Sequence, residues 1–333
     1  MLKRELLRAD QPNQGVVFKK HRGHYFVQSG DRTVVCAISS RLRKDLIYPI
    51  SDPSSGTLRR VRSVEEIKRV DPVAVGDVVR FEDAGDGTGM IKEVLPRRNK
   101  LVRYAAGPKP LEQVIVANVD QFVPIVAAAQ PKPKWGLLDR YLAAAEEAGI
   151  PTLICITKMD LAKRQRLRKT VQIYEDVGYP VVLTSAVTGE GVADFRQTIE
   201  RQVSVLVGMS GVGKTTLLNA VQPGLGLRVR EISQATGKGK HTTSHLEMFP
   251  LDGGGSVVDT PGIKTFGLWE TDSSDLVGLF REMRPYVGRC KFRLDCSHTH
   301  EPGCAIKEAV EVGQISDLRY DSYVRLSRAL RPE

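Results

Sequence analysis

A glycine-rich stretch near the middle of the chain carries the residue types that bind phosphate groups. It reads GMSGVGKT and matches the pattern G-x-x-x-x-G-K-[ST] at every defined position. The apolar run SVLV precedes it and the helix-forming run KTTLLNAV follows it, which predicts a strand, a loop and a helix whose first N–H groups face phosphates. The residues of this predicted nucleotide site are Gly208, Met209, Ser210, Gly211, Val212, Gly213, Lys214, Thr215 and Thr216.

Phosphate chemistry at such a site also requires a cation and metal ligands. Lys214 supplies a positive charge for the β- and γ-phosphates, and the Thr215 hydroxyl can ligate Mg²⁺. Farther along, the run SVVDTPG provides Asp259, which can hold the same ion through water, and Gly262, whose N–H can contact a γ-phosphate. We therefore expect Mg²⁺ to bind with the nucleotide at Thr215 and Asp259.

The segment between these two motifs is polar and rich in glycine and lysine. It reads REISQATGKGKHTTSH, a composition suited to a mobile switch. Either Thr242 or Thr243 could bind Mg²⁺ while a γ-phosphate is present and release it after hydrolysis. Both threonines remain candidates from the sequence.

A tetrapeptide upstream of the phosphate loop indicates which base is bound. Thr157-Lys158-Met159-Asp160 follows the strand-forming run PTLICIT and is close to the Asn-Lys-x-Asp element that reads guanine. The Asp160 carboxylate can accept hydrogen bonds from guanine N1 and N2, and Lys158 can cover the base and reach the phosphate loop. Thr157 replaces the usual Asn, so one side-chain amide is missing.

A second base-binding element comes next, and the order of the elements is unusual. Ser185 and Ala186 follow the run YPVVLT and match a Ser-Ala element whose backbone helps to hold guanine. Thr157 precedes Gly208 by 51 residues, whereas the base reader of an ordinary GTPase follows its phosphate loop. The place of a loop at the edge of a sheet does not depend on the order of the segments in the chain. A cyclic rearrangement of those segments can therefore preserve the whole site. The order therefore predicts a circularly permuted GTPase domain.

A different chemistry is predicted near the C-terminus, where three cysteines and a histidine crowd together. Cys290, Cys296, His298 and Cys304 supply the ligands of a closed tetrahedral Zn²⁺ site, which would be structural because no position is left open. His300 is an alternative ligand, although the spacing favours His298. With five cysteines in all, a disulfide framework is disfavoured, and we expect a reducing, cytoplasmic location.

The elements that position these residues fall into three regions. Residues from about 12 to 100 alternate five short strand-forming runs with turns, which predicts a closed OB-type barrel. From about 112 to 270 strands and helices alternate, which predicts a mostly parallel sheet covered by helices. We expect a multidomain fold: an N-terminal OB-type β-barrel (1–104), an α/β circularly permuted P-loop GTPase domain (105–270) and a C-terminal helical zinc-binding domain (271–333).

The charge of the chain indicates a polyanionic partner. The formal net charge is +10, and residues 1–110 carry +9 of it, with 22 Lys and Arg against 13 Asp and Glu. We expect this first domain to bind nucleic acid. The longest apolar run, FVPIVAAA, is far too short to span a membrane. In the first domain the clustered cations are Arg41, Arg43, Lys44, Arg59, Arg60, Arg62, Arg97, Arg98, Lys100 and Arg103. The aromatic residues of that domain that could stack on bases or fill the core are Tyr25, Phe26, Tyr48 and Phe81.

Taken together, these motifs resemble the small ribosomal subunit-dependent GTPase A family, the circularly permuted bacterial GTPases of ribosome assembly. The resemblance runs over nearly the whole chain and includes LPRRNKLVR, VANVDQ, TKMD, GMSGVGKTTLLN, GKGKHTTSH, DTPGIKTFGLWE and the terminal metal motif. It implies GTP hydrolysis stimulated by the 30S subunit, a late role in 30S maturation, binding to 16S rRNA and one structural Zn²⁺ per chain. We expect a monomer that binds GTP and GDP. The family pattern has one residue fewer between the first two cysteines than this chain has.

The resemblance also suggests how GTP is hydrolysed. Many GTPases place a glutamine that orients water directly after Asp-x-x-Gly, but here Ile263 occupies that position, so slow hydrolysis by the free protein is expected. His241 resembles the switch histidine of the family and is the candidate for positioning water. An RNA-binding assembly factor with a degenerate, structural nucleotide site is the alternative. An ATPase or kinase is disfavoured by Asp160.

Overall fold

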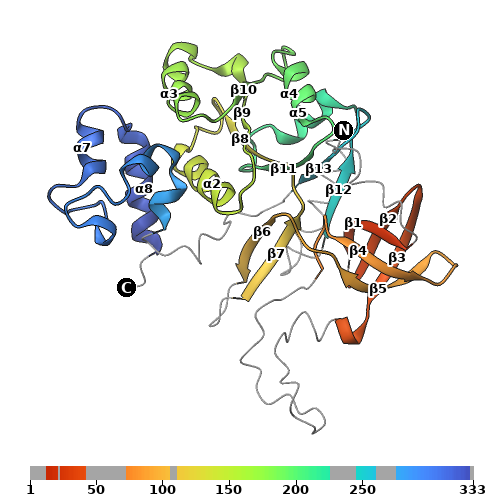
Figure 1. Ribbon diagram of the computed structural model, residues 1–333. Helices are drawn as coiled ribbons and strands as arrows, with labels where there is room; N and C mark the ends of the chain where they lie inside the picture. The colour runs from red at the N-terminus through yellow and green to blue at the C-terminus, as the bar shows by residue number, and fades with distance from the viewer. Residues whose placement is uncertain are drawn as a thin grey trace, which may run out of the picture. The chain divides into compact units, whose positions relative to one another are not determined.

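A computed structural model describes residues 13–21, 23–42, 73–105, 111–225, 245–259 and 275–330 (Figure 1). The chain divides into two compact units. The first combines residues 1–119 with 232–249, and the second combines residues 120–231 with 250–333. Neither unit is continuous in sequence, because the segment at 232–249 returns to the first unit. The three domain boundaries expected from the sequence stay a prediction.

Five strands of the first unit form the closed barrel expected from the sequence. They pair in the order β1-β2-β3-β5-β4, and β4 pairs with β1 to close the barrel. Side chains that alternate along the strands fill the interior, among them Val34 and Cys36 of β3 and Phe81 of β4. The strand bounds are β1 Gln14–His21, β2 His24–Ser29, β3 Arg32–Ile38, β4 Val78–Asp83 and β5 Thr88–Val94.

Two further features belong to the first unit. A hairpin of β6 (Lys100–Ala105) and β7 (Leu111–Ala117) forms a separate two-stranded sheet. Strand β12 (His245–Pro250) pairs antiparallel with β1, in a register that places Lys19 opposite Glu247. Their side chains form an ion pair of 2.8 Å, so this late strand extends the first sheet.

Some residues considered for nucleic-acid binding have structural positions instead. Tyr25 and Phe81 are buried in the barrel core, so their rings cannot stack on bases. Arg97 makes two hydrogen bonds of 2.7 Å to the buried carboxylate of Asp77, and Arg98 donates to the Asn118 carbonyl at 3.1 Å. Arg43, Lys44, Tyr48, Arg59, Arg60 and Arg62 lie outside the described residues, as does the side chain of Arg103.

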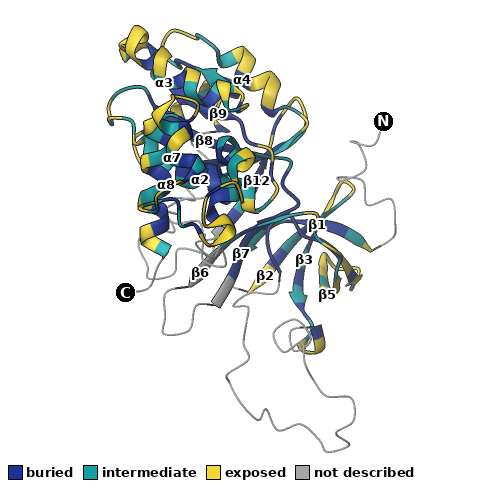
Figure 2. Ribbon diagram, turned by 60° about the vertical axis from the view of Figure 1, so that its left-hand side comes forward, coloured by how far each residue is buried: buried dark blue, intermediate teal, exposed yellow. Residues whose placement is uncertain are grey.

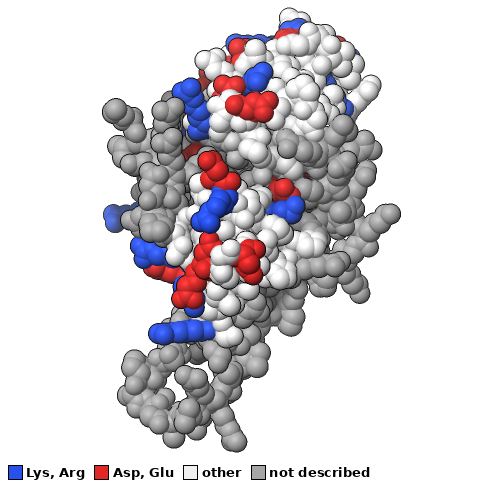
Figure 3. Space-filling view, turned by 90° about the vertical axis from the view of Figure 1, so that its right-hand side faces the viewer, with Lys and Arg blue, Asp and Glu red and all other residues white. Residues whose placement is uncertain are grey.

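Ion pairs neutralise much of the described barrel surface. Arg80 pairs with Glu93 at 2.7 Å, and Lys92 pairs with Glu82 at 2.8 Å. On the face of the molecule drawn in Figure 3, cationic and acidic side chains lie interspersed and do not gather by sign.

The second unit is built on a parallel sheet in the order β10-β9-β8-β11-β13. Every neighbouring pair in it is parallel, as the alternating strands and helices predict. β8 is almost continuously apolar and is buried, which is typical of a strand covered on both faces (Figure 2). The bounds are β8 Gln121–Ala127, α2 Trp135–Glu147, β9 Ile154–Thr157, η3 Met159–Leu161, α3 Arg164–Asp176, β10 Val181–Leu183, α4 Val192–Ile199, β11 Val203–Val207, α5 Lys214–Val221 and β13 Ser256–Asp259.

The C-terminal segment is helical and packs in the same unit. Its core contains Phe280, Met283, Ile306 and Tyr323. Ala143 of α2, a helix that packs on the parallel sheet, is part of the same core. None of the helices in the described ranges is long and apolar enough to cross a bilayer. The elements are η4 Leu276–Leu279, η5 Arg281–Tyr286, η6 Arg293–Asp295, α7 Ala305–Glu311 and α8 Asp317–Leu330.

A buried charge network fastens this segment to α2 and α3. Arg319 of α8 is 1% exposed and donates to Asp139 of α2 at 2.6 Å and to Glu282 of η5 at 2.6 Å. Tyr174 of α3 donates to the same Asp139 oxygen at 3.0 Å, and Phe280 packs its ring against the guanidinium. Burial alone would lower the pKa of Arg319, but the charges of Asp139 and Glu282 outweigh it and raise that pKa.

Replacing Arg319 with Met should destabilise the protein by about 3–5 kcal/mol, because Asp139 and Glu282 would be left buried without their cation. The measurement is the midpoint of urea unfolding followed by circular dichroism. As a control, Arg325→Met removes the exposed pair of Arg325 with Asp321 and should change stability by less than about 0.5 kcal/mol. Equal effects of the two variants would contradict the role given to the buried network.

Candidate functional site

The predicted nucleotide-binding residues lie at one edge of the parallel sheet. Because β9, β10, β11 and β13 run in the same direction, the loops at their carboxyl ends meet at that edge. The chain runs outward from β8 to β10 and then returns to place β11 on the other side of β8. That reversal makes the point between β8 and β11 the place where open α/β sheets bind ligands. His241, Thr242, Thr243 and Gly262 lie outside the described residues.

The phosphate loop connects β11 to α5. Gly213 has a φ of 95° where the helix begins, a conformation that disfavours side chains. A Cβ at Gly208 would lie 2.7 Å from the Ile125 carbonyl oxygen, so only glycine fits beside β8. Lys214 Nζ forms an ion pair with Asp259 Oδ1, and both side chains are largely buried. The structure therefore brings together the cation and the carboxylate that the sequence assigned to phosphate and Mg²⁺.

The tetrapeptide after β9 is bound directly to the phosphate loop. The Thr157 hydroxyl donates to the Val212 carbonyl at 2.5 Å, and Lys158 Nζ donates to the Gly211 carbonyl at 2.7 Å. Lys158 adopts a left-handed backbone conformation, and its ammonium also donates to the carbonyl of Gln130. The hydroxyl of Thr157 thus makes a contact between the two loops although the amide of Asn is missing.

The Ser-Ala element completes the edge. Ser185 Oγ donates to Asp160 Oδ1 at 2.6 Å, while the Asp160 side chain remains exposed. The backbone N–H of Met159 donates to the Thr184 carbonyl at 3.1 Å, which joins the two base-reading loops. Met159 itself packs into the core with Leu167, so its side chain points away from the edge. The loops after β9, β10 and β11 are thus joined by hydrogen bonds into one edge that can hold phosphates at one end and a base at the other.

One contact of this edge had no motif to reveal it. Arg164, the first residue of α3, donates to both carboxylate oxygens of Glu190 at 3.0 and 2.6 Å. These hydrogen bonds lower the pKa of Glu190 below its ordinary value. The pair joins the helix after Asp160 to the loop after Ser185, and only the fold brings its two members together.

The four predicted zinc ligands form a compact buried cluster. Their ligand atoms all lie within 4.8 Å of one another. Cys290 Sγ is 3.8 Å from Cys304 Sγ, and the His298 Nδ1 atom is 3.4 Å and 3.5 Å from these two sulfurs. A tetrahedral Zn²⁺ site has S–S edges of about 3.8 Å and S–N edges of about 3.5 Å, from its usual bond lengths. The donors present therefore fit a tetrahedral metal ion.

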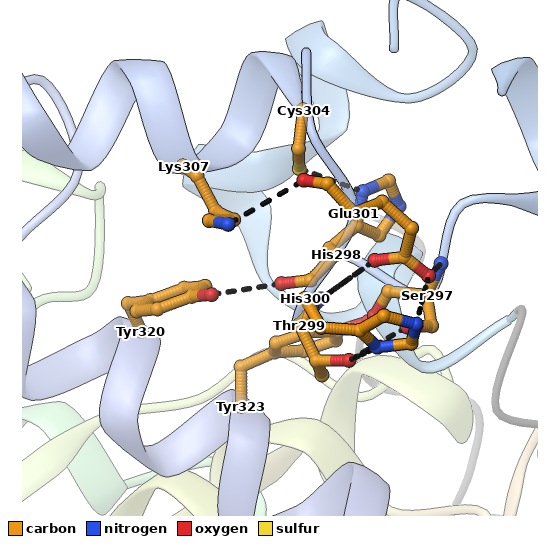
Figure 4. A network of polar contacts seen from close by, with 9 residues as sticks. All are labelled: Ser297, His298, Thr299, His300, Glu301, Cys304, Lys307, Tyr320 and Tyr323. Atoms are coloured by element: carbon orange, nitrogen blue, oxygen red, sulfur yellow. Dashed lines mark hydrogen bonds and ion pairs between the residues drawn. The ribbon is translucent and has the colours of Figure 1, made fainter. Parts of the chain in front are cut away.

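The loop that carries these ligands is held by its own hydrogen bonds (Figure 4). Glu301 accepts hydrogen bonds from the backbone N–H groups of Ser297 at 2.9 Å and Thr299 at 3.1 Å. Burial favours the neutral acid, but these hydrogen bonds lower the pKa of Glu301. Tyr320 of α8 donates to the His298 carbonyl at 2.8 Å and Tyr323 donates to the Ser297 carbonyl at 3.0 Å.

The two histidines of the loop differ in environment. His298 is buried, and burial lowers the pKa of its imidazole, which favours the neutral form that binds metals. His300 is exposed, and its Nδ1 contacts the Thr299 hydroxyl at 3.0 Å. The alternative ligand considered from the sequence is therefore not part of the cluster. A single 3₁₀ turn, η6, lies between Cys290 and Cys296.

A parallel sheet with a phosphate loop at its switch point, preceded in the chain by the base-reading loop, defines a circularly permuted P-loop GTPase. Residues 94–269 match the family model described as RsgA GTPase. The small ribosomal subunit biogenesis GTPase RsgA of Phocaeicola vulgatus is 36% identical over 317 residues, which cover 94% of this chain and 96% of that protein. The protein of the same name from Gemmatimonas aurantiaca is 43% identical over 256 residues, with 76% and 83% covered.

Two solved structures are similar over almost the whole chain. The crystal structure of YjeQ from Thermotoga maritima has a TM-score of 0.70 and 30% identity, and it covers 96% of this chain and 98% of its own. The crystal structure of YloQ, described as a circularly permuted GTPase, has a TM-score of 0.65 and 29% identity, with 96% of each chain covered. This chain belongs to the RsgA GTPase family and is a GTP hydrolase.

Replacing Thr157 with Val should weaken GTP binding about tenfold, because the variant keeps the shape of the side chain but leaves the Val212 carbonyl without its donor. Titration with a fluorescent GTP analogue measures the change. Thr157→Ser retains a hydroxyl and should restore most of the affinity, and Thr170→Val on α3 is the control for a lost hydroxyl elsewhere. Unchanged affinity in Thr157→Val would show that the contact does not position the phosphate loop.

Proposed function

We propose that this GTPase is stimulated by the small (30S) ribosomal subunit and acts late in the assembly of that subunit. The observation that carries the proposal is membership of a family whose curated relatives are named small ribosomal subunit biogenesis GTPases, over 94% of the chain in one case. The net charge of +9 in residues 1–110 supports binding to 16S rRNA. We further propose that the protein acts as a monomer in the cytoplasm and alternates between GTP and GDP.

The proposed nucleotide site uses the connected edge of the sheet. Residues 208–216 would hold the phosphates, Lys214 would contact the β- and γ-phosphates, and Asp160 would read guanine with support from Ser185 and Ala186. The hydroxyl of Thr215 and the carboxylate of Asp259 are suited to hold Mg²⁺, which supplies positive charge at the phosphates. Thr242 or Thr243 and the N–H of Gly262 would sense the γ-phosphate.

Hydrolysis is proposed to depend on His241 and on the ribosome. The residue after Asp-x-x-Gly is Ile263, which cannot orient water, so another group is needed. His241 lies next to the two candidate threonines and can accept or donate a proton near neutral pH. GTP would favour binding to rRNA, and hydrolysis would promote release from the mature subunit.

The test is turnover of GTP and of ATP by the wild-type protein and by His241→Ala, with and without 30S subunits. We expect slow GTP hydrolysis alone, stimulation of about 10²-fold or more by subunits, no ATP hydrolysis, and loss of the stimulation in His241→Ala with unchanged GTP affinity. The exposed His300→Ala is the matched control.

Each part of this proposal can fail separately in that assay. Hydrolysis of ATP at the rate of GTP would refute the assignment of Asp160 to guanine. Turnover that subunits do not change would refute the ribosomal role, and full stimulation of His241→Ala would remove His241 from the mechanism.

We also propose that the metal cluster binds one structural Zn²⁺ through Cys290, Cys296, His298 and Cys304. The native protein should contain one equivalent of zinc by elemental analysis, and Cys296→Ser should lose it and unfold at a lower temperature. His300→Ala should keep its zinc, since His300 faces solvent. Native protein without stoichiometric zinc would overturn this assignment.

A further inference from the structure

The start of α3, which follows the base-reading loop, carries a concentration of positive charge. Residues 163–169 read KRQRLRK and contain five cations and no carboxylate. All five are exposed. Because residues 1–110 account for +9 of the total +10, the rest of the chain is nearly neutral, and this run stands out within it. The cations are Lys163, Arg164, Arg166, Arg168 and Lys169.

The geometry of the helix sorts these cations into two flanks. Leu167, Val171 and Tyr174 are buried and define the face of α3 that packs on the protein. At about 100° per residue, Arg164 and Arg168 lie on one side of that face, Arg166 lies on the other side, and Lys169 points nearly opposite the buried face. Lys163 is the N-cap residue directly before the helix. We call Lys163, Arg166 and Lys169 the basic flank.

The two flanks differ in whether their charges are compensated. Arg164 is bound to Glu190, and Arg168 lies 3.7 Å from Glu175. Within the described part of the chain, none of the three cations of the basic flank forms an ion pair with a carboxylate. The protein thus neutralises one side of α3 and leaves the other side charged.

We propose that Lys163, Arg166 and Lys169 bind the phosphate backbone of RNA. From Lys163 to Lys169 the helix rises about 9 Å, so the three side chains can follow consecutive phosphates of one strand. The apolar face of α3 is already buried in the core, which leaves nothing to insert into a lipid surface. The inference rests on the proposed function, because it takes ribosomal RNA as the polyanion, and it adds a contact surface in the second unit.

The basic flank begins directly after the loop proposed to read guanine. Lys163 comes three residues after Asp160, and Arg164 is bound to the loop that carries Ser185. The residues proposed to bind phosphate at the start of α3 therefore follow directly, in the chain, the loop proposed to read guanine.

The experiment compares the full-length protein with the double variant Arg166→Glu/Lys169→Glu in binding to 30S subunits at several salt concentrations. We expect affinity to fall at least about tenfold, and the slope of log K against log salt to decrease in magnitude by about 1.5–2, for two lost phosphate contacts. The matched control is Arg325→Glu/Arg328→Glu on exposed positions of α8, which changes the net charge equally. Arg166→Lys/Lys169→Arg should bind like the wild type.

Circular dichroism and GTP affinity of the free proteins should be unchanged in all variants, because these side chains are exposed. If both charge reversals weaken binding equally, only net charge matters and the inference is wrong. If the α3 variant binds subunits normally but loses binding to phosphatidylglycerol vesicles or to an acidic protein, the flank serves another partner. Wild-type protein that does not bind subunits at all would refute the proposed function instead.

Discussion

The parallel pairing of β8 with β11 is the contact on which the nucleotide site depends. It aligns Ser204 with Gln121 and Leu206 with Val123, residues that are more than 80 positions apart in the chain. Without it, the phosphate loop after β11 and the base-reading loop after β9 would belong to separate sheets. With it, Thr157 and Lys158 reach the carbonyl groups of the phosphate loop, so the position of one loop fixes the other. The site therefore survives a change in the order of its segments, because pairing in space replaces continuity in sequence.

The C-terminal segment is joined to this sheet by charge as well as by apolar packing. Tyr320 and Tyr323 bind the metal-cluster loop to α8, and Arg319 of the same helix binds α2 and η5. Breaking the buried pair would leave uncompensated carboxylates, so the segment is expected to move together with the sheet. A metal ion held by the cluster would fix this loop and, through Tyr320 and Tyr323, the residues of α8 that contact α2.

The candidate site could be recognised in the sequence more readily than the contacts that support it, and the reason is physical. The phosphate loop and the metal ligands demand particular residue types at particular spacings, so GMSGVGKT and the Cys and His positions could be recognised locally. The pairing of β12 with β1 depends on which edge is free in the folded barrel, and the pairs of Arg97 with Asp77 and of Arg319 with Asp139 join residues far apart in the chain. The sequence does not distinguish an arginine that faces solvent from one that is paired with a buried carboxylate. Only burial in the fold distinguishes Arg97 from Arg166.

Lys214 and Asp259 form an ion pair at the edge of the parallel sheet. Both side chains are largely buried, and an uncompensated charge at either position would be costly. Their mutual contact compensates both charges. In the proposed nucleotide site, phosphates would compensate the charge of Lys214 and Mg²⁺ would compensate the charge of Asp259, so the pair could separate without leaving either charge alone. A nucleotide without its metal would compensate only the lysine. On that proposal, the ion pair would favour binding of GTP and Mg²⁺ together.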